Sequence, residues 1–147
     1  MDGTIQKPYA RHLKEGMTFI EIVIVLAIIA IMATVVVPNL MSYVNSSKKS
    51  TAKSTVQALQ GAINMFNVHT GRYPVSLNEL VKKPTDERVS KKWEGPYIKQ
   101  KEIPLDPWGE RYVYKVTPQA EHLYELYSYG PDGRGAPKSE WINVWDL

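Results

Sequence analysis

The stretch Gly16-Met17-Thr18-Phe19-Ile20-Glu21, followed by an uncharged apolar run over residues 22–37, decides how this chain folds. Residues 17–37 number 21. A helix rises by about 1.5 Å per residue, so a helix of this length covers the roughly 30 Å of a bilayer's hydrocarbon core. The rest of the 147-residue chain has no second apolar run of this length. The sequence therefore predicts one membrane-spanning helix and a soluble remainder.

The charges on the two sides of this run predict its orientation. Residues 1–16 carry three basic and two acidic side chains, whereas no charge follows the run until Lys48. Excess positive charge marks the cytoplasmic side, so we expect a cytoplasmic N-terminus and an exported C-terminal domain. Without residues 1–16 the net charge is about +2, from 15 basic and 13 acidic residues (18 − 3 and 15 − 2). This weak balance argues against dedicated nucleic-acid binding.

A cleaved secretory signal is an alternative interpretation of a basic start and an apolar run. Such a signal is cut after its apolar region, at a site where two small residues are spaced by two. Ala27, Ala30 and Ala33 are spaced by three instead. They form a small-residue stripe on one helix face, which favours close helix packing. We therefore expect the apolar helix to remain attached to the chain.

Glu21 is the only carboxylate within residues 17–37. An acidic side chain at the centre of a spanning helix costs roughly 2.5–3.5 kcal/mol on insertion scales. Attraction to the positive helix N-terminus returns only about 0.3–1 kcal/mol. Removing one member of a buried ion pair typically costs about 3–5 kcal/mol, so pairing inside an apolar bundle is a much larger effect. The sequence predicts a cationic partner for Glu21.

Gly16, Glu21 and the apolar run together resemble the processing motif of the type IV pilin superfamily, which contains prepilins and pseudopilins. The resemblance implies that a membrane aspartic prepilin peptidase cuts after Gly16, and that Met17 becomes the N-methylated first residue. It also implies that Glu21 meets the Met17 amine of a neighbouring subunit in a filament. Residues 1–16 would then be a removed leader, and residues 17–37 the transmembrane and filament-core helix.

Residues 38–147 are expected to form a periplasmic domain. Pro38 would leave the Thr34 carbonyl without its helical donor and kink the chain, and the resemblance implies an extended or unwound helix just before it. Beyond it, apolar residues recur at three- and four-residue intervals, as in an amphipathic helix that covers a core. A simple helix stop at the membrane edge is therefore disfavoured. The helix should end near Gly71, before Tyr73-Pro74.

Shorter elements are expected after Gly71. Ser76-Leu77-Asn78-Glu79 has the capping-box pattern of a helix start, and residues 82–102 are predicted to form a long exposed loop. Alternation predicts paired strands at residues 111–116 and 122–129, with residues 141–145 as a candidate third strand. The expected fold is α+β and type IV pilin-like. In it a long N-terminal helix, half transmembrane and half amphipathic, packs on a small three-stranded antiparallel sheet.

The soluble half resembles one branch of the superfamily, the major pseudopilins (G subunits) of type II secretion. The resembling segments keep their order over nearly all of the chain after Gly16: Gly71-Arg72-Tyr73-Pro74, Gly95-Pro96-Tyr97-Ile98, Leu105-Asp106-Pro107-Trp108-Gly109, Tyr127-Ser128-Tyr129-Gly130-Pro131-Asp132-Gly133 and Ile142-Asn143-Val144-Trp145.

This second resemblance implies a single-pass inner-membrane protein that polymerises with itself. The implied product is a periplasmic pseudopilus that drives export of folded proteins across the outer membrane. The implied partners are minor pseudopilins, the prepilin peptidase and the inner-membrane secretion platform, with no nucleic acid. A subunit of a type IV pilus or a competence pilus is the alternative.

The same branch binds calcium in the loop between its last strands. Calcium takes six to eight oxygen ligands. Asp132 matches the first acidic ligand of the branch, with Ser128 and the Tyr129 carbonyl nearby. Trp141 stands where the branch usually has a second aspartate, so Glu140 or Ser139 is the candidate substitute. A plain hairpin turn is the alternative to a calcium site.

Catalytic chemistry has little support in the sequence. His12, His69 and His122 are scattered and show no metal-ligand or nucleophile spacing. The chain has no cysteine, so it has neither a thiol nucleophile nor a thiolate metal ligand. We therefore predict no catalytic residues, and expect a structural protein that is not an enzyme.

Overall fold

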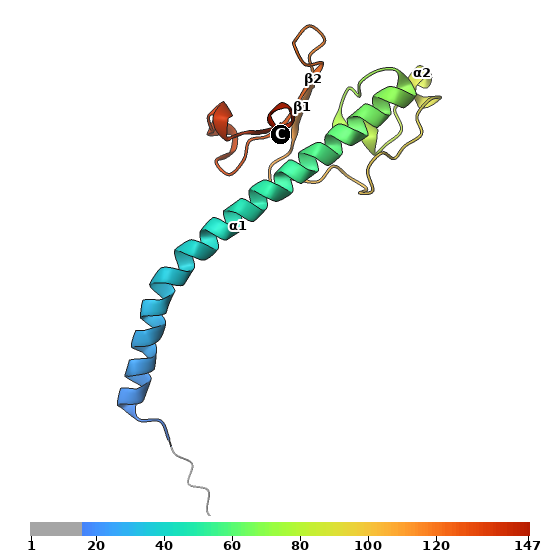
Figure 1. The fold of residues 1–147 in the computed structure, drawn as a ribbon. Coiled ribbons are helices and arrows are strands. Elements are labelled where there is room, and N and C mark those ends of the chain that lie inside the picture. The colour runs from blue at the N-terminus through green and yellow to red at the C-terminus, as the bar shows by residue number, and fades with distance from the viewer. Residues whose placement is uncertain (1–15) are drawn as a thin grey trace, which may run out of the picture. The chain divides into compact units, whose positions relative to one another are not determined.

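The computed structural model of this protein describes residues 16–147, so the predicted leader lies outside the described residues except for Gly16 (Figure 1). Along the chain the elements are the long helix α1 (Phe19–Thr70), a 3-10 turn at Leu77–Leu80, the short helix α2 (Glu87–Ser90), the strands β1 (Val113–Val116), β2 (Tyr124–Ser128) and β3 (Ile142–Asn143), and 3-10 turns at Gly133–Gly135, Lys138–Glu140 and Val144–Asp146. The described residues form two compact units, which divide between Leu40 and Met41.

Helix α1 begins and ends as its sequence predicts. It continues through Pro38, so this proline does not end the helix, and the predicted amphipathic continuation is confirmed. Gly71 then adopts a φ of +80° and its amide donates to the Asn67 carbonyl at 2.8 Å. Glycine suits this left-handed position after a helix because it has no Cβ to clash. A broken or extended helix at Pro38 in a filament stays a prediction.

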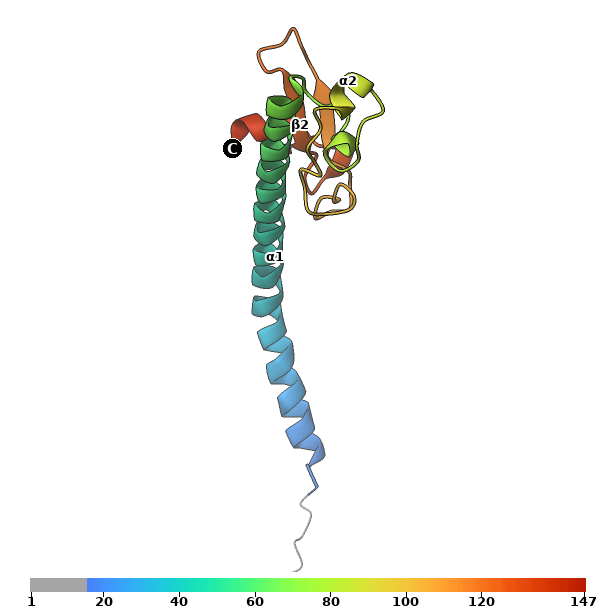
Figure 2. The ribbon, with the colours of Figure 1, turned by 90° about the vertical axis from the view of Figure 1, so that its right-hand side faces the viewer.

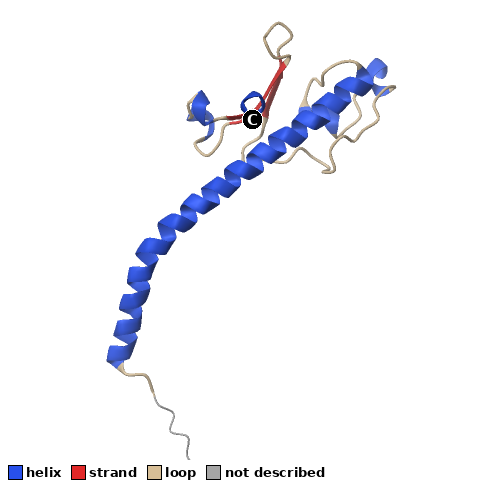
Figure 3. Ribbon diagram, viewed as in Figure 1, coloured by secondary structure: helices blue, strands red, loops and turns tan. Residues whose placement is uncertain are grey.

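The three strands form one antiparallel sheet in the order β1-β2-β3 (Figures 2 and 3). In the register, Val113 pairs with Tyr127 and Ser128 pairs with Ile142. Alternate residues of β2 are buried, as a half-covered strand requires, while Glu125 between them is exposed. Strand β3 has only two residues because the chain turns into a 3-10 helix at Val144. The predicted α+β fold with a three-stranded antiparallel sheet is confirmed.

The hydrophobic core lies within the second unit, between the C-terminal half of α1 and the sheet. Phe66 on the helix and Leu126 on β2 are both 0% exposed. The buried core residues are Ala52, Val56, Leu59, Ala62, Ile63, Phe66, Leu77, Leu80, Val89, Tyr112, Tyr124, Leu126, Ile142 and Val144. The helical members recur at three- and four-residue spacing, so one stripe of α1 supplies one side of this core.

The prediction of an exposed loop over residues 82–102 is wrong in part. This segment contains α2, and Val89 at its centre is buried in the core. The Trp93 indole Nε1 donates to the Glu79 carbonyl at 2.8 Å, and the Tyr97 amide donates to the Leu80 carbonyl at 2.8 Å. Charged residues around Val89, Trp93 and Tyr97 gave the segment its loop-like composition. These three residues anchor the segment to the domain.

The predicted start of a short helix at Ser76 is confirmed by the 3-10 helix Leu77–Leu80, whereas the predicted capping box is wrong. Ser76 makes no side-chain capping hydrogen bond, and the element after it is a single 3-10 turn. The Glu79 carboxylate instead forms a two-pronged ion pair with Arg72, with Nη1–Oε2 at 3.0 Å and Nη2–Oε1 at 3.2 Å. It also accepts from the Val75 amide at 3.0 Å. A guanidinium with two parallel donors is a stronger partner for a carboxylate than one backbone amide, and it draws Glu79 away from the cap.

Candidate functional site

The peptide bond between Gly16 and Met17 lies in extended, exposed chain just before α1. Neither residue is helical, and Met17 is 70% exposed. A Cβ added to Gly16 would meet no atom within 4 Å. The subunit itself therefore gives no steric reason for glycine at this position.

Glu21 and Thr18 form a reciprocal capping box at the start of α1. The Thr18 amide donates to Glu21 Oε2 at 3.4 Å, and the Glu21 amide donates to Thr18 Oγ1 at 3.3 Å. Both contacts are at the long end of the hydrogen-bond range and both are exposed. The first amides of a helix have no partner inside the helix, so this carboxylate relieves one of them.

Sequence reasoning assigned this motif to the wrong place. The pattern of Thr18 followed three residues later by Glu21 was as visible as the one at Ser76. The apolar residues around it directed attention to the insertion cost of the carboxylate. The capping box holds Glu21 only weakly, because the two contacts are long and open to solvent. The carboxylate is therefore available for a stronger partner.

Helix α1 carries an uninterrupted apolar surface behind Glu21. It is the one helix among the described residues that is long and apolar enough to cross a membrane. The most apolar 18-residue stretch of this helix is not buried by the described residues. Its exposed large apolar residues include Ile22, Val23, Ile24, Val25, Leu26, Ile28, Ile29, Ile31 and Met32. A contiguous surface of this size marks contact with lipid or with other protein.

Two of the four predicted calcium ligands, Ser128 and Glu140, have partners within the protein. The Ser128 hydroxyl is buried and donates to Asp106 Oδ2, and it accepts from the Gly130 amide at 3.0 Å. The Glu140 carboxylate pairs with Lys49 on α1 at 3.7 Å. Among residues 16–147 no group of three or more His, Asp or Glu side chains could hold a metal ion. Asp132 and the Tyr129 carbonyl complete the expected ligand set, and calcium binding at this loop stays a prediction.

Asp106 has a structural role that the sequence did not reveal. It is 5% exposed, and its Oδ1 accepts from the amides of Trp108 at 3.1 Å and Glu110 at 2.8 Å. Its other oxygen accepts from Ser128, 22 positions further along the chain. The turn sequence around Asp106 was recognised, whereas its partner at the end of β2 depends on the tertiary fold. The pair ties the turn to the sheet.

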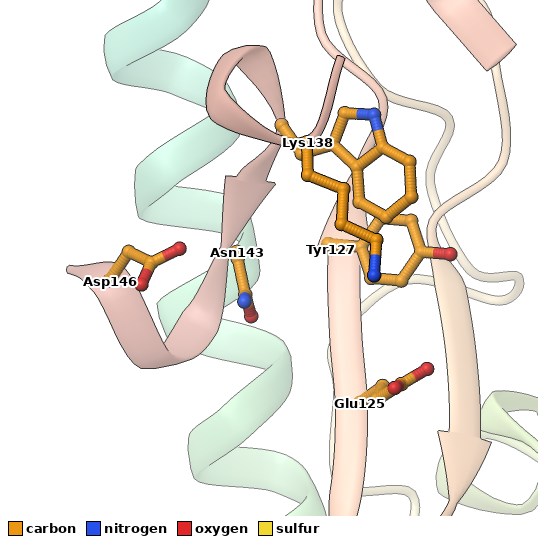
Figure 4. Close-up of a pocket in the computed structure, with 6 residues that line it drawn as sticks. Glu125, Tyr127, Lys138, Asn143 and Asp146 are labelled. Carbon is orange, nitrogen blue, oxygen red and sulfur yellow. The ribbon is translucent and has the colours of Figure 1, made fainter. Parts of the chain in front are cut away.

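The outer face of the sheet carries a shallow groove, drawn in Figure 4. Its lining residues are Glu125, Tyr127, Lys138, Trp141, Asn143 and Asp146. The Tyr127 and Trp141 rings stack there with centroids 4.5 Å apart and planes 10° apart. Neither this groove nor the N-terminal segment brings together a nucleophile, a base and an orienting group.

The chain fits a membrane-anchored subunit of the type IV pilin class. It has an exposed bond after Gly16, a capped carboxylate at Glu21 and an exposed apolar helix joined to a small sheet domain. The family model for the prokaryotic N-terminal methylation motif matches residues 11–37. The model for protein G of the type II secretion system matches residues 39–145. The chain therefore belongs to the type II secretion system protein G family.

Individual relatives agree with this assignment. The chain is 37% identical to type II secretion system core protein G of Pseudomonas aeruginosa over 142 residues, covering 92% of this chain and 98% of the relative. The Escherichia coli K12 core protein G is 37% identical over 139 residues, covering 91% and 92%. The crystal structure of the major pseudopilin from the type 2 secretion system of enterohaemorrhagic E. coli matches with a TM-score of 0.59 and 31% identity, covering 77% of this chain and 99% of that one.

Proposed function

We propose that this chain is a prepilin peptidase substrate that polymerises into the periplasmic pseudopilus of a type II secretion system. The observation that carries the proposal is the pairing of two features at the start of α1. An exposed, non-helical Gly16–Met17 bond is followed within one helical turn by a weakly held carboxylate, Glu21. The apolar part of α1 that follows Glu21 is exposed in the subunit.

In this proposal the chain crosses the inner membrane once with its N-terminus in the cytoplasm, where residues 1–16 are removed. Gly16 serves the peptidase, because the subunit itself gives no reason for a missing Cβ there. Hydrolysis of the bond turns the Met17 amide nitrogen into an amine, which is mainly protonated at neutral pH. Methylation of that amine keeps its positive charge.

The new amine is the cationic partner that Glu21 lacks before cleavage. In a filament core the Glu21 carboxylate of one subunit would leave its long contact with Thr18 and pair with the Met17 amine of a neighbour. A charge-assisted contact is roughly twice as strong as a neutral hydrogen bond. Excluding water strengthens it further, because the effective dielectric falls. Cleavage would thus license assembly.

The apolar helix supplies packing, and the charge pair supplies register. Lipid tails are as apolar as isoleucine, so moving α1 from membrane to filament gains no hydrophobic transfer energy. Close packing along the stripe of Ala27, Ala30 and Ala33 is the remaining attraction. Such packing is similar when one subunit's helix is shifted along its axis relative to its neighbour's. The ion pair forms at only one such shift, so it selects the register between the subunits.

The assembled filament would drive folded proteins through the outer membrane. We expect it to work with minor pseudopilins and to be assembled on the inner-membrane secretion platform. Membership of the protein G family supports this role over that of a type IV or competence pilus subunit.

The test separates cleavage from assembly. The chain is co-produced with its peptidase and platform, the mass of the subunit is measured, and filaments are sedimented and imaged. Glu21→Ala should give a correctly cleaved, methylated subunit and no filaments. Gly16→Val should give uncleaved subunit and no filaments. Normal filaments from Glu21→Ala would refute the proposed role of the carboxylate.

A further inference from the structure

We propose that the C-terminal loop of this subunit is closed by an aromatic clasp centred on Trp141, and that the domain folds independently of calcium. The clasp consists of Tyr127, Tyr129, Lys138 and Trp141. The resemblance to calcium-binding relatives makes a cation the natural expectation for this loop. The contacts of this chain instead assign the closing role to side chains.

The clasp joins two segments that the loop must hold together. Trp141 stacks on Tyr127 of β2 with centroids 4.5 Å apart, and it meets the Tyr129 ring edge-on at 5.3 Å. Its indole Nε1 donates to the Ala136 carbonyl at 3.0 Å. One side chain thereby binds the end of β2 to the loop that returns to β3.

Lys138 adds a positive charge where a metal would need negative ones. Its ammonium lies over the Trp141 ring, 5.8 Å from the centroid, within the range of a cation–π contact. Figure 4 shows the Lys138 side chain extending toward the Tyr127 ring. Because like charges repel, an ammonium at this place disfavours a divalent cation and stabilises the aromatic stack.

Two of the predicted ligand side chains are engaged elsewhere. Glu140 turns to Lys49 on α1, and the Ser128 hydroxyl joins Asp106 to the Gly130 amide. Gly130, with a φ of +79°, packs so closely that an added Cβ would lie 2.8 Å from the Glu140 carbonyl oxygen. The two loop segments therefore approach each other closely at Gly130 and Glu140.

The two ways of closing a loop respond differently to metal. An ion that binds only the folded state raises stability with its concentration, so a metal-closed domain loses stability in a chelator. A clasp of side chains is indifferent to both calcium and chelator. Trp141 stands at the position where relatives are expected to carry an aspartate. The same substitution therefore removes a carboxylate that calcium would need and supplies the central ring of the clasp.

The experiment is a thermal melt of the full chain in detergent micelles, followed by near-ultraviolet circular dichroism. It is run once with excess EDTA and once with millimolar calcium chloride. The same Tm in both is expected, together with no saturable heat when calcium is titrated calorimetrically. A calcium-dependent rise in Tm, or saturable binding heat, would overturn the proposal.

Two variants test the clasp itself. Trp141→Ala should lower Tm by several degrees, and by the same amount with EDTA and with calcium. Trp141→Phe keeps a ring for stacking but loses the indole hydrogen bond, so its Tm should lie between those of Trp141→Ala and the parent. It also covers the case in which the alanine variant fails to fold. A parent-like Tm for Trp141→Ala would remove Trp141 from the closing role.

Discussion

Within residues 19–37 the apolar side chains of α1 lie open, with Ile24 at 53% and Ile31 at 69% exposure, whereas Phe66 and Leu126 in the second unit are 0% exposed. The same helix thus supplies both surfaces. Its C-terminal half completes a core inside one subunit, whereas the large apolar side chains of its N-terminal half lie exposed. The contrast teaches that this fold divides its apolar residues between folding and assembly.

The largest expected effect concerns assembly and separates two roles of Glu21. Glu21→Ala removes both the cap and the charge, Glu21→Gln keeps an acceptor for the Thr18 amide but loses the charge, and Thr18→Ala keeps the charge but loses its part of the cap. Because the intersubunit pair needs the charge, both Glu21 variants should lose filaments and Thr18→Ala should keep most of them. Sedimentation and electron microscopy measure this. Filaments from Glu21→Gln would assign the residue to capping alone.

The second prediction places matched truncations in the two halves of α1. Phe66→Ala should lower the free energy of unfolding by about 3–5 kcal/mol, because it leaves a cavity in a packed core. Ile24→Ala removes apolar atoms from a surface that the subunit leaves open. Its effect on the unfolding of the detergent-solubilised subunit should stay within about 0.5 kcal/mol. Similar losses in the two variants would mean that the N-terminal half also packs inside the subunit.

The third prediction concerns the ion pair that displaced the expected cap. Glu79→Ala should lower the free energy of unfolding by about 1–3 kcal/mol, because it leaves the partly buried Arg72 guanidinium without its ion-pair partner. Glu125→Ala, on the exposed face of β2, should change it by no more than about 0.5 kcal/mol. Chemical denaturation of both variants tests this. Equal effects would show that the Arg72 pair behaves as an ordinary surface contact.

The smallest expected effect is a loss of stability in alkali. Burial, followed by the neighbouring Tyr124 and Glu79, raises the pKa of Tyr114 above its ordinary 10.0. Its hydroxyl also donates to the Pro74 carbonyl at 2.9 Å, which favours the protonated form. The unfolded chain releases this proton first, so the contribution is fully present below about pH 10 and is lost as pH rises above it. Melts of the parent and Tyr114→Phe across this range should show a shallower decline for the variant.

Local patterns predicted most of the fold. The apolar run, the three- and four-residue spacing beyond Pro38 and the Gly71 stop define α1, since each acts through neighbours along the same helix. Alternation located β1 and β2 for the same reason. The third strand came out shorter than expected because the Asn143 side chain accepts from the Trp145 amide at 3.3 Å and turns the chain.

Contacts between distant residues were beyond local patterns. Arg72 competes for Glu79 across seven positions, so the capping-box signature failed at Ser76, while the same signature held at Thr18. The composition of residues 82–102 likewise concealed the Trp93 anchor. The capping signature at Thr18 was present in the sequence, whereas the length and exposure of its two contacts with Glu21 depend on the folded structure. The proposed partner of Glu21 belongs to another subunit.

A cryo-electron microscopy reconstruction of the filament formed by the processed chain tests the central claim most directly. The account predicts that the Met17 amine of one subunit lies within about 4 Å of the Glu21 carboxylate of a neighbour, the distance of an ion pair. A filament in which Glu21 still caps Thr18 in its own helix, with the Met17 amine turned elsewhere, would contradict it.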